Sequence, residues 1–217
     1  MTLNFQRNLL AAVIVSATLT ACSPPKGQVK TEELAAASTR ISASNSHWLL
    51  LGTQAQGAYA LTDTPLTPRF HWHTNRDFPT PITAIAIAAN APKAITATND
   101  QLVIWNCDTG QAAHYLSAPA VINALAINNE GTLAALALTN NTAVIINLVR
   151  GGVVNTYTHK SPVLSIAISG EHLLTGEEAN SAHLWQINQG TPLESFEHKD
   201  GVNYVAFGPA NTLVTSG

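Results

Sequence analysis

A repeat of about forty residues is the feature that most constrains how this chain can fold. A six-residue apolar motif with alanine at its fifth position occurs four times, at intervals of 40, 41 and 39 residues. Its copies span residues 82–87, 122–127, 163–168 and 202–207. A fixed period of this length is typical of repeat architectures. Runs this apolar predict inner β-strands buried on both faces, with alanine where a neighbouring sheet comes close.

A second motif keeps the same spacing and ends in Trp105, Ile146 or Trp185. Short apolar runs closed by polar turn residues lie between the two motifs, and a turn followed by a more polar strand comes after the second. Each unit therefore predicts four short antiparallel strands, and the predicted fold class is all-β.

This pattern resembles the WD-repeat β-propeller family over residues 47–217. Trp105 and Trp185 match the family's tryptophan, and His159 and His198 stand where a histidine opens a repeat. The resemblance implies blades of four antiparallel strands and a structural role for these four residues.

The resemblance is incomplete at particular positions. The aspartate that follows the family's tryptophan is replaced by Asn106 and Gln186. The buried Asp–His–Ser/Thr–Trp hydrogen-bond network of the family is therefore expected only in part, and other propeller families with similar blades stay open.

About four blades are expected, at the bottom of the range of roughly 4–8 for propellers. Residues 47–79 predict the last three strands of one blade, three full repeats follow, and the final copy reaches its second strand at Gly217. Strand 201–207 would complete the first blade of a closed four-bladed ring. The surplus strand at 211–217 favours an incomplete ring instead, truncated or split. An open ring leaves strand edges that invite pairing with another chain.

The N-terminus has the three-part layout of a secretory signal over residues 1–21. Arg7 precedes an apolar run of 11 residues, whereas a membrane-spanning helix needs about 20. Residues 19–22, Leu-Thr-Ala-Cys, resemble the bacterial lipobox. The resemblance implies that Cys22 is lipidated and becomes the first residue of the mature protein; an ordinary cleaved signal is the alternative. Residues 22–46 are then the lipidated cysteine and a flexible tether.

Ser23 follows the lipobox cysteine. In that family an aspartate there resembles an inner-membrane retention signal, so the resemblance implies an outer-membrane protein facing the periplasm rather than an inner-membrane one.

The charge balance and the number of cysteines exclude several classes of protein. Ten Lys and Arg residues against 13 Asp and Glu give a net charge of −3, without a basic cluster that could follow a phosphate backbone, which argues against nucleic-acid binding. If Cys22 is acylated, Cys107 has no partner, which excludes a disulfide framework and a cysteine zinc site.

Three patterns that resemble catalytic or metal sites favour other interpretations. Residues 108–110 spell the Asp-Thr-Gly of aspartic proteases, but sister repeats place unrelated turns there. His71 and His73 share one face of a strand without a third ligand nearby in sequence. Glu177 and Glu178 point to opposite faces and favour a polar turn. His159 and His198 are expected to hold turns between blades by hydrogen bonds. We predict no catalytic residue, cofactor or metal.

The predicted function is a non-catalytic protein–protein interaction scaffold, anchored to the membrane through lipid on Cys22, with an unknown protein partner. A propeller enzyme or a quinone-cofactor-binding periplasmic protein is the alternative. It would need histidines or charged residues converging on the channel, whereas the inner strands consist mainly of Ala, Ile and Leu.

Overall fold

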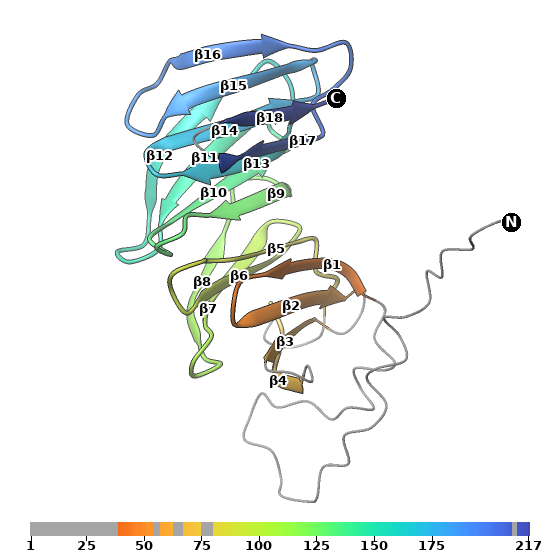
Figure 1. Cartoon of the computed structure of the whole chain (residues 1–217), viewed down its shortest axis with the longest axis vertical. Helices are drawn as coiled ribbons and strands as arrows, with labels where there is room; N and C mark the ends of the chain where they lie inside the picture. Colours follow the sequence, from red (N-terminus) through yellow and green to blue (C-terminus); the bar gives the residue numbers. More distant parts are fainter. Residues whose placement is uncertain (1–38, 54–56, 63–66, 75–79, 210–211) are drawn as a thin grey trace, which may run out of the picture.

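The computed structural model describes residues 39–53, 57–62, 67–74, 80–209 and 212–217, and in this part of the chain the fold is all-β (Figure 1). The strands form four antiparallel sheets of four strands and one sheet of two strands. The predicted signal segment 1–21 and Cys22 lie outside the described residues.

The sheets follow one another in chain order. Sheet 1 contains β1 (Thr39–Ser44), β2 (Trp48–Thr53), β3 (Ala58–Thr62) and β4 (Thr67–Trp72). Sheet 2 contains β5 (Ala84–Ile87), β6 (Lys93–Thr98), β7 (Gln101–Asn106) and β8 (Ala112–Ser117). Sheet 3 contains β9 (Ile122–Ile127), β10 (Leu133–Leu138), β11 (Thr142–Asn147) and β12 (Val153–Thr158). Sheet 4 contains β13 (Val163–Ser169), β14 (His172–Glu177), β15 (Ser181–Gln186) and β16 (Pro192–Glu197). Sheet 5 contains β17 (Tyr204–Phe207) and β18 (Leu213–Ser216).

Within every sheet, strands that are consecutive in the sequence are neighbours and pair antiparallel. The first strands of successive sheets, β1, β5, β9, β13 and β17, lie beside one another. The predicted unit of four antiparallel strands is therefore confirmed. The described sheets do not close into a ring, as expected, and sheets 1 and 5 stand apart in the open stack (Figure 1).

The beginning of the folded part differs from the prediction. Strand β1 falls inside the segment 22–46 that we expected to be a tether, and it pairs with β2 as the first strand of sheet 1. The prediction missed it because its sequence, TRISAS, has none of the dense apolar character of the later first strands. Since β1 completes sheet 1 and β17 pairs with β18, a closed four-bladed ring using strand 201–207 is excluded.

Apolar side chains fill the spaces between consecutive sheets. Leu136 and Leu138 of sheet 3 pack with Ile95 and Ile104 of sheet 2, and all four are buried. Similar clusters lie between sheets 1 and 2, between sheets 3 and 4, and between sheets 4 and 5. Because each sheet buries both faces only when it has neighbours, the core of this protein is a series of layers.

The first strands are less buried than predicted. Ala84, Ile85 and Ala86 of β5 are buried, but residues 123–127 of β9 are partly or fully exposed. Each of these strands pairs with only one strand of its own sheet. Since the described sheets do not close around a centre, the inner side of β9 keeps access to solvent.

The turns after the second strands use asparagine in the left-handed conformation. Asn99, Asn141 and Asn180 have φ values of 43°, 63° and 66°. Asparagine adopts this conformation more readily than other residues that carry a side chain. The polar turn residues noted in the sequence thus fix the short connections that lead into the third strands.

Candidate functional site

The two tryptophans singled out in the sequence occupy equivalent places in sheets 2 and 4. Trp105 on β7 donates its indole N–H to Thr96 Oγ1 at 2.8 Å, and Trp185 on β15 donates to Thr175 Oγ1 at 2.9 Å. Both indoles are buried between sheets. Each thereby joins the third strand of its sheet to the second by a side-chain hydrogen bond.

The two histidines that open repeats behave differently from each other. His198 Nε2 lies 2.9 Å from Thr215 Oγ1, so this ring links the loop after sheet 4 to sheet 5. His159 follows β12 and is buried, but neither of its ring nitrogens has a hydrogen-bond partner. His159 therefore holds its turn through its backbone, whose N–H donates to Asn141 O at 2.9 Å, and not through its ring.

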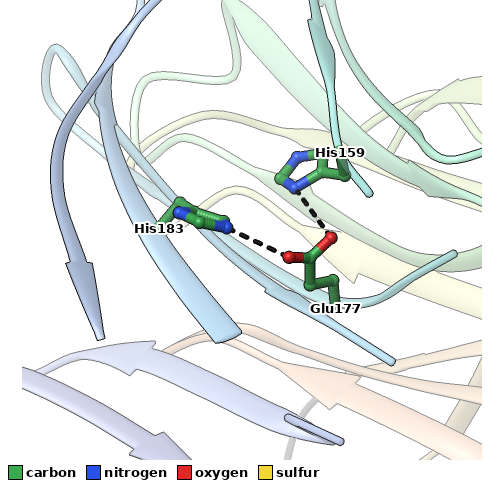
Figure 2. A group of neighbouring side chains, drawn as sticks. All are labelled: His159, Glu177 and His183. Carbon is green, nitrogen blue, oxygen red and sulfur yellow. Dashed lines mark hydrogen bonds and ion pairs between the residues drawn. The ribbon is translucent and has the colours of Figure 1, made fainter. Parts of the chain in front are cut away.

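His159 instead faces Glu177, which stands at the end of β14, and His183 of β15 approaches the same carboxylate (Figure 2). His159 Nδ1 lies 3.8 Å from Glu177 Oε2, and His183 Nε2 lies 3.2 Å from Glu177 Oε1. One ligand atom from each of the three residues lies within 4.8 Å of the others. We call these three residues the His–Glu–His cluster.

Glu177 has no exposed surface but is well supplied with donors. Ser181 donates its hydroxyl to Oε1 at 2.6 Å, and the backbone N–H groups of Lys160 and Ser161 donate to Oε2 at 3.0 and 3.2 Å. Burial raises the pKa of this carboxyl, but the hydrogen bonds from Ser181, His183 and Ser161 outweigh it, so its pKa lies below the ordinary value. The group is a buried carboxylate at neutral pH.

The His159 imidazole is neutral at physiological pH. Burial lowers its pKa to about 4, and the opposing attraction of Glu177 is too weak to restore it. The contact between His159 and Glu177 is therefore not an ion pair at neutral pH. The ring is held by aromatic contacts, with its centroid 5.2 Å from Trp185 and 5.5 Å from His183.

The partner of His183 on its other side is Ser195. His183 Nδ1 lies 2.8 Å from Ser195 Oγ on the neighbouring strand β16, where the two residues are paired across the ladder. The His183 side chain is 16% exposed, so solvent reaches the cluster from this side. Two imidazoles and a carboxylate in one partly accessible cluster are the ligand types that zinc and related divalent ions prefer.

The sequence did not point to this cluster as a unit. Glu177 was expected in a polar turn, whereas it is buried and only Glu178 is exposed. Aligning the repeats would have identified the site, because Glu177 and His183 are equivalent to the apolar residues Leu138 and Val144 of sheet 3. A polar residue at a position that is apolar in the neighbouring repeat is the sequence feature to look for.

The Asp-Thr-Gly tripeptide forms the turn between β7 and β8. Asn106 Oδ1 accepts the backbone N–H groups of Asp108 and Thr109 at 2.9 and 3.1 Å. Gly110 has a φ of 72°, and a Cβ there would lie 2.3 Å from the Phe70 ring. Asp108 is exposed. The geometry is that of a tight turn closed by an asparagine side chain.

His71 and His73 lie close together at the end of sheet 1, with ring centroids 4.3 Å apart. His71 stacks on Tyr59 at 4.3 Å, and burial followed by the charge of His71 lowers the pKa of His73. Among the described residues, the only group of three metal-ligating side chains is the His–Glu–His cluster. The described residues also include no helix long and apolar enough to cross a bilayer.

The repeated antiparallel sheets define this chain as an all-β repeat protein with propeller-like blades. Its fold is similar to that of the computationally designed Ika8 protein, with a TM-score of 0.68 and 15% sequence identity. The similarity covers 82% of this chain and 54% of the designed protein, so the chain spans about half of that protein's length. At this identity the likeness shows the fold alone. No family model matches the sequence, and no curated protein matches it significantly.

Proposed function

We propose that this protein is a non-catalytic interaction scaffold, anchored in the bacterial cell envelope through lipid on Cys22, whose WD-repeat-like blades hold a protein partner. The resemblance of residues 19–22 to a lipobox supports the anchor. The Trp–Thr and His–Thr hydrogen bonds in sheets 2, 4 and 5 support the WD type, since they are parts of that family's buried network. The observation that carries the interaction role is the outer edge of β12.

Strand β12 is the last strand of sheet 3, so within the described residues only one of its edges is paired. Its first two residues, Val153 and Val154, are 64% and 42% exposed, and Val149 in the preceding turn is 61% exposed. These three exposed valines lie at the start of β12 and in the turn before it, next to the unpaired edge of the strand. Exposed apolar clusters at strand edges are characteristic of interaction surfaces.

Two of the other outer strands, β4 and β16, are protected by the devices that proteins use against edge pairing. Strand β4 contains Pro68 and Arg69, and β16 begins at Pro192 and carries Glu194 and Glu197. Proline removes a donor, and charges oppose the approach of a second sheet. Strands β8 and β12 have neither feature, and of these two only β12 carries exposed valines.

The partner that fits this edge is an extended protein segment with alternating apolar side chains. Such a segment adds as a further antiparallel strand, with backbone hydrogen bonds supplying affinity and side-chain contacts supplying specificity. The Gly151 and Gly152 turn before β12 leaves room for it, because a Cβ at either position would have nothing within 4 Å.

Site-specific photocrosslinking in bacterial envelopes tests this role. A crosslinking amino acid at Val153 should capture one protein, and the same probe at Leu193 on β16, which is 49% exposed, should not. Adding Val154→Lys should abolish capture while the melting temperature stays the same. Equal capture from both positions, or capture that survives Val154→Lys, would contradict the proposal for β12.

The anchor is tested separately by the mass of the mature protein. Wild-type protein extracted from membranes with detergent should carry a lipid-sized increment on Cys22, and Cys22→Ser should be released from the membrane. A wild-type product that is soluble and unmodified would overturn the anchor but leave the edge of β12 as an interaction surface.

A further inference from the structure

The His–Glu–His cluster has a feature that its protein contacts do not explain. His159 has no exposed side-chain surface, and neither ring nitrogen has a hydrogen-bond partner, yet Nδ1 faces a carboxylate. A buried polar group without a partner destabilises the folded state. A ligand that accepted the Nδ1 lone pair would remove part of that cost.

The neighbouring repeat shows that the fold does not require these residues. One repeat earlier, the positions of His159, Glu177 and His183 are occupied by Ala118, in the loop before sheet 3, and by Leu138 and Val144 of sheet 3. These apolar residues pack in the cluster between sheets 2 and 3. Because apolar replacements of buried ionic groups are often neutral or stabilising, His159, Glu177 and His183 call for a role other than packing.

We propose that His159, Glu177 and His183 form a binding site for a divalent transition-metal ion of the zinc type. The set of two imidazoles and one carboxylate is one that binds zinc with a fourth position left for water. Ligand atoms around tetrahedral zinc stand about 3.3 Å apart, so donor atoms within 4.8 Å of one another need to close by at most about 1.5 Å.

The surroundings hold the carboxylate in place between the two rings. Ser181 and the backbone N–H groups of Lys160 and Ser161 donate to Glu177, whose Oε2 faces His159 and whose Oε1 faces His183. The hydrogen bond from His183 to Glu177 is lost on binding. If the His183 proton then resides on Nδ1, that nitrogen donates to Ser195 Oγ and Nε2 is free to bind the metal. Such an outer partner fixes the tautomer of a metal-binding histidine.

The bound ion would connect two sheets. His159 lies in the loop that leaves sheet 3, whereas Glu177 and His183 belong to sheet 4. The metal would therefore tie that loop to the strands β14 and β15, and it would stabilise the folded chain in proportion to its affinity. This role is independent of the proposed edge of β12.

Zinc binding by the purified full-length chain, stripped with a chelator, tests the proposal. We expect one Zn²⁺ per chain and a higher melting temperature in its presence. His183→Gln, which changes the partly exposed ligand, should weaken binding by about 100-fold or more, and Ser195→Ala by about tenfold. Unchanged affinity in His183→Gln would overturn the proposal whatever the stoichiometry.

Tryptophan fluorescence locates the ion. Trp185 has its ring centroid 5.2 Å from His159 and 5.7 Å from His183, while Trp48, Trp72 and Trp105 lie between sheets 1 and 2. Co²⁺ bound in the cluster should quench Trp185, and Trp185→Phe should lose that quenching while retaining Zn²⁺. Quenching that persists in Trp185→Phe would place the ion elsewhere and contradict the site.

Two control variants separate this site from other histidines. His198→Gln changes the equivalent residue of the next repeat, whose ring contacts Thr215, and His71→Gln changes the histidine pair of sheet 1. Both should bind Zn²⁺ like the wild type. Loss of binding in either control together with retention in His183→Gln would assign the metal to other histidines and overturn the proposal. Glu177→Gln should also lose Zn²⁺ binding. If this variant fails to fold, the affinity of His183→Gln for Zn²⁺ tests the proposal instead.

Discussion

Sheets 3 and 4 have the same order of strands, but they differ in the polarity of several interior side chains. Four equivalent positions are apolar in sheet 3 and polar or aromatic in sheet 4: Leu136, Leu138, Val144 and Ile146 correspond to Thr175, Glu177, His183 and Trp185. The same holds in the loops that precede the two sheets, where Ala118 corresponds to His159. The registers agree, since Leu136 pairs with Val144 and Thr175 pairs with His183. The blade geometry therefore does not depend on a buried polar network.

This difference in polarity should affect how each sheet responds to substitution. An apolar side chain in sheet 3 needs only contact with its neighbours, whereas each polar group in sheet 4 needs its partners to be present. Glu177 accepts hydrogen bonds from two backbone amides and from the Ser181 hydroxyl, so its loss removes the acceptor of three donors. The stability of sheet 4 should therefore fall when one polar residue is replaced alone, and fall less when its interacting partner is replaced as well.

Moving the carboxylate into the apolar sheet should have the largest effect. Leu138→Glu places a charge at a fully buried position whose surroundings are apolar. We expect a loss of about 3–5 kcal/mol in the free energy of unfolding, because an uncompensated charge is buried. Urea unfolding followed by circular dichroism measures it. Leu138→Met is the matched control and should cost less than about 1.5 kcal/mol. A similar small loss for both would mean that the two sheets do not differ as described.

Removing the carboxylate from the polar sheet should cost somewhat less. Glu177→Leu gives sheet 4 the residue of sheet 3 but removes the acceptor of the Lys160 and Ser161 N–H groups and the short hydrogen bond from Ser181, for an expected loss of about 2–4 kcal/mol. Adding His183→Val, which matches Val144, should recover at least about 1 kcal/mol, because the two residues are coupled. The same urea experiment on both single variants and the double variant measures the coupling. Strictly additive losses would show that the cluster does not act as a unit.

The repeat predicted most of the fold because it reports on packing. Apolar motifs at a constant interval marked the first and third strands of sheets 2, 3 and 4, and the structure has strands there. Strand β1 escaped prediction because its pairing to β2 rests on backbone hydrogen bonds, which leave little trace in the sequence TRISAS. Backbone pairing is common to all residues other than proline, so the sequence pattern detects burial better than it detects pairing.

The candidate site was less predictable than the fold. Trp105, Trp185 and His198 make side-chain hydrogen bonds at positions that the repeat identified. The meeting of His159 with Glu177 could not be read from spacing, because the two are 18 positions apart and come together through the turn between sheets. Whether a glutamate at a strand end is buried depends on the neighbouring sheet, which a local pattern does not describe.

The indole hydrogen bond allows a finer comparison, since sheet 3 has Ile146 in place of tryptophan. Trp185→Phe removes the donor to Thr175 and part of a buried ring, and Trp105→Phe does the same to Thr96. We expect each to lower the free energy of unfolding by about 1–2 kcal/mol. Ile146→Leu should cost less than either, because no hydrogen bond is lost there. Thermal denaturation of the three variants ranks them, and a larger loss for Ile146→Leu would contradict the role given to the indoles.

The smallest effect is expected at the position after each third strand, where sheets 2, 3 and 4 place Cys107, Leu148 and Ile187. All three are buried, and their backbone N–H groups donate to equivalent carbonyls of Pro92, Thr132 and Glu171. Cys107 thus occupies an apolar site, and Cys107→Val should change the free energy of unfolding by less than about 1 kcal/mol.

Burial, with a smaller contribution from Asp108, raises the pKa of the Cys107 thiol to about 12. Because the thiolate is the nucleophile, a thiol titrating so high is almost entirely protonated and unreactive at pH 8. Iodoacetamide should therefore label Cys107 only when urea unfolds the chain, as mass spectrometry of the peptide containing Cys107 would show. Rapid labelling of the folded protein would mean that Cys107 is more exposed than Leu148 and Ile187, and that the three positions are not equivalent.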